Sequence, residues 1–343
     1  MNYQQVKNFL ITNYQQEKPL VAFIEGSPGV GKSACVYDAT ETLAKKFKEE
    51  GFGIKECRLS LLDPTDLRGT MWVDMQDKIT RWSPPEMLPN GHDPKRGFFY
   101  LDELNTAPPL VQNAALQLMF FPYKLGEYQL QYPKWLPVSA GNPQGEAYVY
   151  SFSPALANRM VQITLNPELD EWIGWATKVG INPETISFLL FRRDLFLQVD
   201  KSGKPFPSPR AHEFVDRAEK AQMSTEVLVG IEGEGWVLEY MAYKEVYKSL
   251  PDMDKILKGE NIVPSEPSVL FAVVGNLLSK AHEDNKLVDR IVSYSLSLPA
   301  EFSVVLMKGL LGAFPAVVWK APAWKEWKEQ YKEVTLWSSN SQT

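Results

Sequence analysis

A short apolar run, a glycine-rich turn and an amphipathic segment constrain this chain more than any other feature. Leu20–Ile24 is continuously apolar, as in a strand buried on both faces of a parallel sheet. Gly26–Gly31 follows as the turn, and Ser33–Glu50 has helical spacing that ends at Gly51. A strand, a turn and a helix in this order predict the opening of a βαβ unit.

The turn fits the pattern G-x-x-x-x-G-K-[ST]. Its residues are Gly26, Ser27, Pro28, Gly29, Val30, Gly31, Lys32 and Ser33. Small residues allow consecutive backbone N–H groups to curl around phosphate oxygens, and the positive end of the following helix dipole points at the same anion. Lys32 is predicted to neutralise charge on the β- and γ-phosphates, and the Ser33 hydroxyl to ligate Mg²⁺. The alternative is an ordinary glycine-rich turn.

A second apolar run ends in two acidic residues. Phe98–Leu101 predicts a buried strand with Asp102 and Glu103 at its C-terminal end. Ligands of open α/β sheets bind at the carboxyl ends of the strands. If this strand neighbours the first, Asp102 would hold Mg²⁺ directly or through its water, and Glu103 would orient and polarise an attacking water. The alternative is a helix N-cap followed by a first-turn acid.

Strand and helix patterns alternate through the rest of the first half of the chain. Further strands are predicted over Ile54–Leu61, Trp135–Ala140 and Met160–Leu165, and helices over Val6–Tyr14 and Pro109–Phe120. This alternation predicts an α/β fold with a parallel sheet up to about residue 166.

The pattern becomes mostly helical from Pro167 onward, and length alone predicts roughly two domains. The helices expected in this part are Leu169–Val179, Glu184–Gln198, Arg210–Gln222, Val227–Leu250 and Pro267–Leu278. We therefore expect an all-helical second part. A polar segment containing Trp337 ends the chain, and we expect it to be frayed.

Charge and cysteine content exclude several classes of protein. There are 36 basic and 42 acidic residues, a net charge of −6, which disfavours non-specific nucleic-acid binding but leaves a local basic patch open. Two cysteines, Cys35 and Cys57, exclude a disulfide framework and indicate a reducing compartment. The three histidines are far apart in the sequence, so no zinc-binding spacing occurs.

Neither end of the chain indicates a membrane segment. The N-terminus has no basic region leading into an apolar stretch, as a secretory signal would. The longest apolar stretch, Phe302–Trp319, is interrupted by Lys308 and Pro315 and falls short of a membrane span. We expect a soluble cytoplasmic protein.

Several ordered motifs together resemble the AAA+ ATPases, and within them the MoxR-like and dynein-related group, over about residues 1–225. Gly26–Ser33 resembles the Walker A loop, and Phe98–Glu103 resembles the Walker B strand. Asp66–Gly69 is similar to the D-L-x-G segment of the group, and Leu101–Asn105 with the helix after it also resembles the group.

Three further segments resemble functional motifs of the same family. Ala140–Pro143 resembles the sensor 1 segment, Ala155–Arg159 the arginine-finger segment, and Ser208–Arg210 the sensor 2 segment.

The resemblance implies a role for one polar residue in each of these segments. Asn142 would position the attacking water together with Glu103, Arg159 would reach into the site of a neighbouring subunit, and Arg210 would connect a helical lid to the γ-phosphate. Each has an ordinary alternative. Asn142 could start a turn, Arg159 could be a surface cation, and Arg210 could simply begin a helix.

The resemblance also implies an architecture and an assembly. It predicts an AAA+ P-loop core over 1–166, with a parallel sheet sandwiched by helices, an all-helical lid over 167–250, and a helical C-terminal extension with a polar tail over 251–343. The implied assembly is a ring, usually a hexamer, with ATP bound between subunits. Relatives often act with a von Willebrand factor A-like protein, so we expect a protein partner of that kind and no membrane.

Two alternatives to a protein-remodelling ATPase remain open from the sequence. One is a nucleic-acid-directed NTPase of the restriction or motor type, and the other is a nucleotide-dependent scaffold with little turnover. The segment Met71–Trp82 predicts a hairpin that either grips a polypeptide in a central pore or packs on its own domain. Residues after 250 match no motif of the group.

Overall fold

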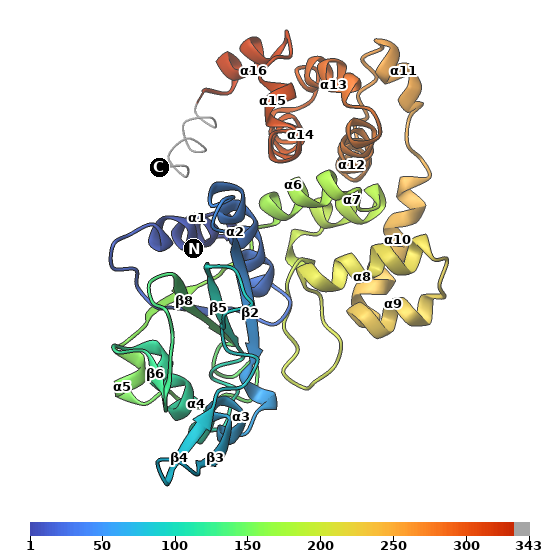
Figure 1. Ribbon diagram of the computed structural model, residues 1–343. Coiled ribbons are helices and arrows are strands. Elements are labelled where there is room, and N and C mark those ends of the chain that lie inside the picture. The colour runs from blue at the N-terminus through green and yellow to red at the C-terminus, as the bar shows by residue number, and fades with distance from the viewer. Residues whose placement is uncertain (333–343) are drawn as a thin grey trace. The chain divides into compact units, whose positions relative to one another are not determined.

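The computed structural model describes residues 1–332, and the chain divides into two compact units, Met1–Asn166 and Pro167–Thr343 (Figure 1). Trp337 and the polar segment expected to fray lie outside the described residues. The predicted fold class, a parallel α/β core followed by a helical region, is confirmed. The predicted end of the lid at residue 250 stays a prediction.

The first unit is built on a five-stranded parallel sheet with the order β2-β5-β8-β1-β9. Its strands are β1 (Ala22–Glu25), β2 (Phe52–Arg58), β5 (Arg96–Asp102), β8 (Trp135–Gly141) and β9 (Val161–Thr164). Because all five strands run in one direction, their carboxyl ends lie along one edge. The predicted Ile54–Leu61 strand ends at Arg58, and a 3₁₀ turn, η1 (Leu59–Leu61), follows it.

Helices cover both faces of this sheet. The helices of this unit are α1 (Tyr3–Tyr14), α2 (Lys32–Lys46), α3 (Pro64–Arg68), α4 (Pro109–Leu116) and α5 (Pro154–Ala157). Alternate side chains of β5 point to opposite faces. Phe98 packs edge-on against Tyr14 of α1 with ring centroids 5.6 Å apart, whereas Phe99 and Leu101 share an apolar cluster with Val111 of α4.

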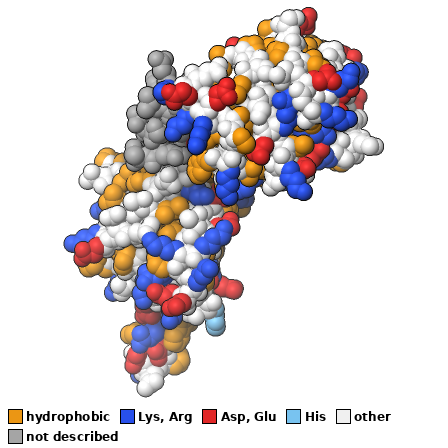
Figure 2. Space-filling model, turned by 90° about the horizontal axis from the view of Figure 1, so that it is seen from above, with side chains coloured by type: hydrophobic (Ala, Val, Ile, Leu, Met, Phe, Trp, Pro, Cys, Tyr) orange, Lys and Arg blue, Asp and Glu red, His pale blue; other side chains and the backbone are white. Residues whose placement is uncertain are grey.

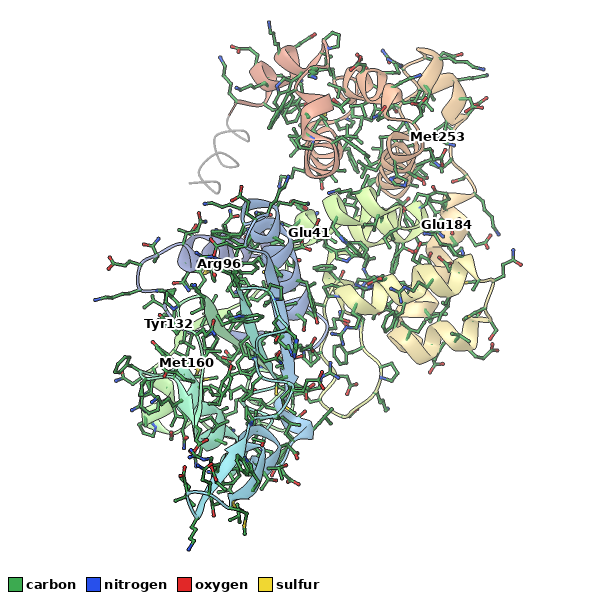
Figure 3. All side chains as sticks on the ribbon, viewed as in Figure 1. Glu41, Arg96, Tyr132, Met160, Glu184 and Met253 are labelled. Carbon is green, nitrogen blue, oxygen red and sulfur yellow. The ribbon has the colours of Figure 1, made fainter. Side chains whose placement is uncertain are left out.

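Arg96 fixes the beginning of β5. Its guanidinium, labelled in Figure 3, donates hydrogen bonds of 2.9 and 3.2 Å to the carboxylate of Glu50, and it lies 5.0 Å from the centre of the Phe47 ring. Tyr14 donates a hydrogen bond of 2.8 Å to the Lys134 carbonyl at the same end of the sheet. These contacts tie α1 and the segment after α2 to the amino end of the sheet.

Two antiparallel hairpins project from the α/β unit. The predicted hairpin over Met71–Trp82 is confirmed as β3 (Thr70–Asp74) paired with β4 (Ile79–Ser83). Arg81 of β4 forms ion pairs of 2.8 Å with Asp74 of β3 and 2.6 Å with Asp77 of the connecting turn. A second hairpin, β6 (Lys124–Leu125) with β7 (Tyr128–Gln129), was not predicted, since each strand is too short to carry a pattern.

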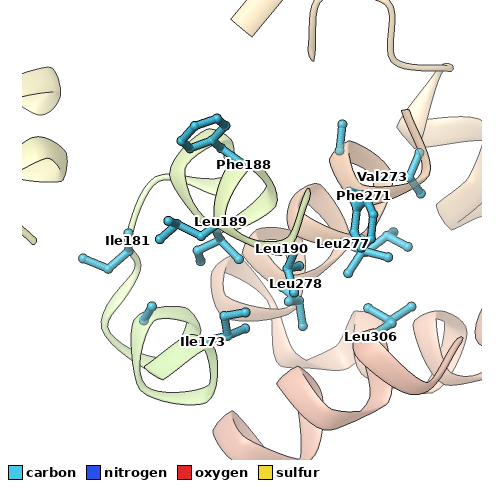
Figure 4. Close-up of a cluster of buried hydrophobic side chains, with 14 of the residues drawn as sticks. Ile173, Ile181, Phe188, Leu189, Leu190, Phe271, Val273, Leu277, Leu278 and Leu306 are labelled. Carbon is cyan, nitrogen blue, oxygen red and sulfur yellow. The ribbon is translucent and has the colours of Figure 1, made fainter. Parts of the chain in front are cut away.

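The second unit is helical throughout its described residues. Its helices are α6 (Leu169–Val179), α7 (Pro183–Phe191), α8 (Pro209–Lys220), α9 (Thr225–Glu232), α10 (Glu234–Tyr247), α11 (Met253–Lys258), α12 (Pro267–Glu283), α13 (Val288–Ser295), α14 (Ala300–Ala313), α15 (Pro315–Val318) and α16 (Trp324–Gln330). Figure 4 shows part of their shared core, where Ile173, Leu189, Leu277 and Leu306 come from four different helices. Burial of each such side chain stabilises the fold by about 1.5–3 kcal/mol.

The prediction of one helix over Val227–Leu250 was wrong. Gly233 separates α9 from α10 with φ 89° and ψ 160°, a conformation that favours glycine. The break turns Glu232 into the core, where its carboxylate lies 2.7 Å from Nδ1 of the fully buried His212. Burial raises the pKa of Glu232. Nε2 of His212 faces the Phe196 carbonyl at 2.9 Å, so this histidine has partners on both sides.

Two other expectations concern cysteines and membranes. Cys35 and Cys57 are both buried, and they form no disulfide with each other. Within residues 1–332, every helix is too short or too polar to cross a bilayer.

Two glycines allow a close backbone crossing of α6 and α14 in the helical unit. A Cβ atom at Gly174 of α6 would lie 2.9 Å from Cα of Gly312 on α14. We expect Gly174→Ala to lower the free energy of unfolding by about 1–3 kcal/mol, because the helices must move apart. Urea unfolding followed by tryptophan fluorescence measures the change.

Gly230 of α9 provides the matched control, since a Cβ atom there meets nothing within 4 Å. Gly230→Ala should raise stability by up to about 1 kcal/mol through helix propensity. Equal effects of the two substitutions would contradict the account of the crossing.

Candidate functional site

The glycine-rich loop lies between the carboxyl end of β1 and the start of α2. Gly29 and Gly31 have φ values of 82° and 97°, and Gly31 is the N-cap of α2. A Cβ atom at Gly26 would lie 3.0 Å from both the Leu165 carbonyl oxygen and a methyl group of Val30. Backbone conformation favours glycine at positions 29 and 31, and close contacts favour it at position 26. Left-handed residues next to a helix start form the N–H concavities that bind anions.

Lys32 folds back over this loop. Its ammonium donates hydrogen bonds to the carbonyls of Gly26 (2.5 Å) and Ser27 (3.1 Å) and to Oδ1 of Asn142 (3.0 Å). The structure thus brings Asn142, at the end of β8, next to the predicted phosphate-binding lysine. The positive end of the α2 dipole repels the ammonium group beside it. An anion bound at the same place would offset this repulsion.

Asp102 ends β5, but β5 is not the neighbour of β1. β8 lies between them, so the expectation of adjacent strands was wrong. Asp102 is 9% exposed, and its Oδ1 accepts hydrogen bonds from the Tyr100 hydroxyl (3.1 Å) and the Glu103 N–H (2.9 Å). Burial raises the pKa of this carboxyl group.

Tyr100 connects the two residues predicted to hold Mg²⁺. Its hydroxyl lies 3.1 Å from Ser33 Oγ and 3.1 Å from Asp102 Oδ1. Burial raises the pKa of the Tyr100 phenol, so the phenol keeps its proton. β8 lies between β1 and β5, and the Tyr100 side chain of β5 connects Asp102 with Ser33 despite this intervening strand.

Glu103 is held in an unusual backbone conformation. Its φ is 58°, in the left-handed region that a non-glycine residue rarely adopts. Ser60, just beyond the end of β2, donates a hydrogen bond to its carboxylate. Ser60 was not among the predicted site residues, because it falls inside the predicted strand Ile54–Leu61. Strained residues of this kind cluster at functional sites.

Asn105 clamps the segment that contains Asn142. Its side-chain N–H group donates to the Asn142 carbonyl (2.7 Å), and its Oδ1 accepts from the Asn142 N–H (3.1 Å). A Cβ atom at Gly141 would lie 2.1 Å from Oδ1 of Asn105, so glycine is required there. Asn105 is buried, and it positions the backbone from which Asn142 reaches Lys32.

The two candidate arginines lie on different units. Arg159 is exposed, donates a hydrogen bond of 3.0 Å to the Ala155 carbonyl, and has its guanidinium 4.3 Å from the centre of the Phe120 ring. Arg210 is exposed in the first turn of α8 in the second unit. The role of each arginine stays a prediction.

The donor set fits magnesium rather than a protein-only metal centre. Within residues 1–332, no cluster of three or more His, Cys, Asp and Glu side chains is placed to hold a metal ion. Mg²⁺ is usually bound by one or two carboxylates together with phosphate oxygens and water. The Ser33 hydroxyl and the Asp102 carboxylate, beside the predicted phosphate-binding loop, match that requirement.

The comparisons with known proteins leave the family open. No protein-family model matches the chain, and no curated protein matches its sequence. Solved structures with similarity include a candidate ATPase from Cytophaga hutchinsonii (16% identity, 88% of this chain and 78% of that chain, TM-score 0.32). NtrX from Brucella abortus in complex with ADP aligns at 12% identity over 90% of this chain and 68% of its own, with a TM-score of 0.37.

A point mutant of RuvB from Thermotoga maritima aligns at 16% identity over 81% of this chain and 83% of its own, with a TM-score of 0.41. At TM-scores this low, the similarities establish neither the family nor the function. The function must be inferred from the geometry of the site.

The Asn105 clamp can be tested directly. Asn105→Ala removes the partners of two backbone groups of Asn142, and we expect the free energy of unfolding to fall by about 1–3 kcal/mol. Asn8→Ala is the control, since Asn8 makes an exposed hydrogen bond with Gln4 on α1 and should change stability by less than about 0.5 kcal/mol. A loss at Asn105 no larger than at Asn8 would contradict the clamp.

Proposed function

We propose that this chain is an ATP-hydrolysing AAA+ ATPase of the MoxR-like type, which assembles as a ring, usually a hexamer, and remodels or matures a protein partner. The observation that supports the ATPase part best is the convergence of three distant segments at one edge of the sheet. They are the glycine-rich loop with Lys32 and Ser33, the end of β5 with Tyr100 and Asp102, and Asn142 after β8.

Each residue has a chemical task in this proposal. Backbone N–H groups of Gly26–Ser33 bind phosphate oxygens, and Lys32 neutralises β- and γ-phosphate charge. Ser33 and Asp102 hold Mg²⁺, which when bound neutralises the charge that develops on the phosphates. Glu103 and Asn142 orient the attacking water. Glu103 can do so once its carboxylate leaves Ser60, to which it is hydrogen-bonded in this structure.

In this proposal, two exposed arginines connect the bound nucleotide to the neighbouring subunit and to the lid. The Arg159 side chain is exposed on the α/β unit, where it contacts Ala155 and Phe120, and its exposure leaves it accessible to a neighbouring subunit. Arg210 in α8 would link the lid to the γ-phosphate, so that hydrolysis changes the lid angle. A von Willebrand factor A-like protein is the expected partner, and the expected location is the cytoplasm.

A nucleic-acid-directed NTPase is the second candidate. Basic and acidic side chains are interspersed over the face seen in Figure 2, and this mixing does not resemble the one-sided basic surface of a duplex-binding protein. The net charge of −6 also disfavours non-specific binding to nucleic acid. Stimulation of ATP hydrolysis by DNA or RNA at low salt would favour this second candidate over protein remodelling.

Loss of the Lys32 ammonium should weaken nucleotide binding. We expect Lys32→Ala to reduce ATP affinity by about 10- to 100-fold, because a charged group in contact with phosphate contributes about 1.5–3 kcal/mol. Titration calorimetry with a non-hydrolysable ATP analogue measures it. Lys45→Ala on the same helix is the control, since Lys45 is exposed and pairs with Glu41. Equal affinities of the two variants would overturn the assignment of the loop.

Loss of the Glu103 carboxylate should separate binding from hydrolysis. Glu103→Gln is expected to bind ATP with nearly wild-type affinity and to lower the hydrolysis rate by about 100-fold or more, because a positioned general base contributes on that scale. A phosphate-release assay measures the rate. Hydrolysis at the wild-type rate would exclude Glu103 as the residue that orients water.

The contribution of Arg159 from a neighbouring subunit can be tested by mixing. Arg159→Ala alone should lower turnover by about 10³-fold or more. Mixed with Glu103→Gln subunits, which supply an intact Arg159, the Arg159→Ala subunits should regain part of their turnover. Unchanged turnover in Arg159→Ala, or no recovery on mixing, would refute the assigned role.

A further inference from the structure

Tyr100 is the one polar side chain in the buried middle of β5. It is 0% exposed, and its neighbours along the strand, Phe98, Phe99 and Leu101, are apolar. A phenylalanine would pack in the same place, but it would lack the hydroxyl that lies 3.1 Å from Ser33 Oγ and 3.1 Å from Asp102 Oδ1. A buried phenol usually has a hydrogen-bond partner. Here the hydroxyl has two partners, Ser33 and Asp102, and both are magnesium ligands in the proposed function.

The chemistry of the three groups fixes the direction of the hydrogen bonds. An ionised carboxylate only accepts, so the Tyr100 hydroxyl donates to Asp102. The phenolic oxygen then accepts from the Ser33 hydroxyl. The Ser33 proton is thereby turned towards Tyr100, and the lone pairs of Ser33 Oγ stay available to a cation. The Glu103 N–H also donates to Oδ1 of Asp102. Both hydrogen bonds therefore use Oδ1, and Oδ2 is the oxygen that the proposal assigns to the cation.

We propose that Tyr100 is a positioning residue for the magnesium ion of the bound nucleotide, and that it presets the Ser33 hydroxyl and the Asp102 carboxylate to receive that ion. The inference rests on the proposed function, because it concerns the cation that accompanies ATP. Preset ligands bind without first reorienting, so the phenol adds to the affinity for the cation rather than to the affinity for the phosphates.

Tyr100→Phe isolates this effect, because it removes one oxygen and keeps the ring. In the full-length chain, the affinity for a non-hydrolysable ATP analogue is measured by calorimetry with excess Mg²⁺ and again with EDTA. The ratio of the two affinities gives the coupling between cation and nucleotide. We expect Tyr100→Phe to lower this ratio by about tenfold, the equivalent of one charge-assisted hydrogen bond, and to leave the EDTA affinity within about twofold.

Tyr14→Phe is the matched control. Tyr14 is also buried on the α1 side of the sheet, and its hydroxyl donates a 2.8 Å hydrogen bond to Lys134 at the opposite end of the strands. This variant should keep the wild-type ratio even if it loses as much stability as Tyr100→Phe. A fall of the ratio in both variants would assign the effect to general packing and overturn the proposal.

A second variant tests whether Tyr100 acts through Ser33. In a Ser33→Ala background, Tyr100→Phe should lower the ratio by less than it does in the wild-type chain, since only its contact with Asp102 remains. If the two substitutions lower the affinity ratio by independent factors that multiply in the double variant, the proposal is contradicted. If the wild-type chain binds no ATP analogue, the proposed function fails. If the wild-type chain shows Mg²⁺-enhanced binding and Tyr100→Phe keeps the wild-type ratio, this inference alone fails.

Discussion

The Lys32 ammonium is the group on which the arrangement of the site depends. Its three hydrogen bonds join the start of the glycine-rich loop to the end of β8, two segments more than a hundred residues apart in the sequence. These contacts place the positive charge of Lys32 at the carboxyl edge of the sheet, where the proposed function puts the phosphates.

The order of the strands explains why polar groups gather at this edge. β8 lies between β1 and β5, so Asn142 leaves the sheet between the loop and Asp102. The polar groups described there have hydrogen-bond partners, most of them from other elements. Tyr100 connects Ser33 to Asp102, Asn105 holds Asn142, and Ser60 holds Glu103. Buried polar networks of this kind stabilise one arrangement when every member is satisfied.

The sequence predicted those parts of the fold whose signals are local. The strand, loop and helix around Gly26–Ser33, the hairpin at Met71–Trp82 and most helix starts follow from periodicity and turn residues. The break at Gly233 was missed because one glycine within a helical pattern is often tolerated, and here its positive φ turns Glu232 inward. The placement of β8 between β1 and β5 has no local signal.

The supporting residues of the site could not be predicted for the same reason. Ser60 reaches Glu103 across 43 residues of sequence, Tyr100 reaches Ser33 across 67, and Asn105 reaches Asn142 across 37. Pattern reasoning could predict which residues would touch a nucleotide because their spacing follows from phosphate chemistry. It missed the side chains that hold them, because those contacts depend on which strands become neighbours.

Hydrogen exchange at the loop is the most direct test of the central claim. Amide exchange in residues 26–33 would be measured by mass spectrometry with and without Mg²⁺ and a non-hydrolysable ATP analogue. If main-chain amides there grip the triphosphate, exchange in this segment slows on addition of the nucleotide. If the exchange of 26–33 is unchanged at nucleotide concentrations that alter exchange elsewhere, or if no segment responds, this loop is not a phosphate-binding site.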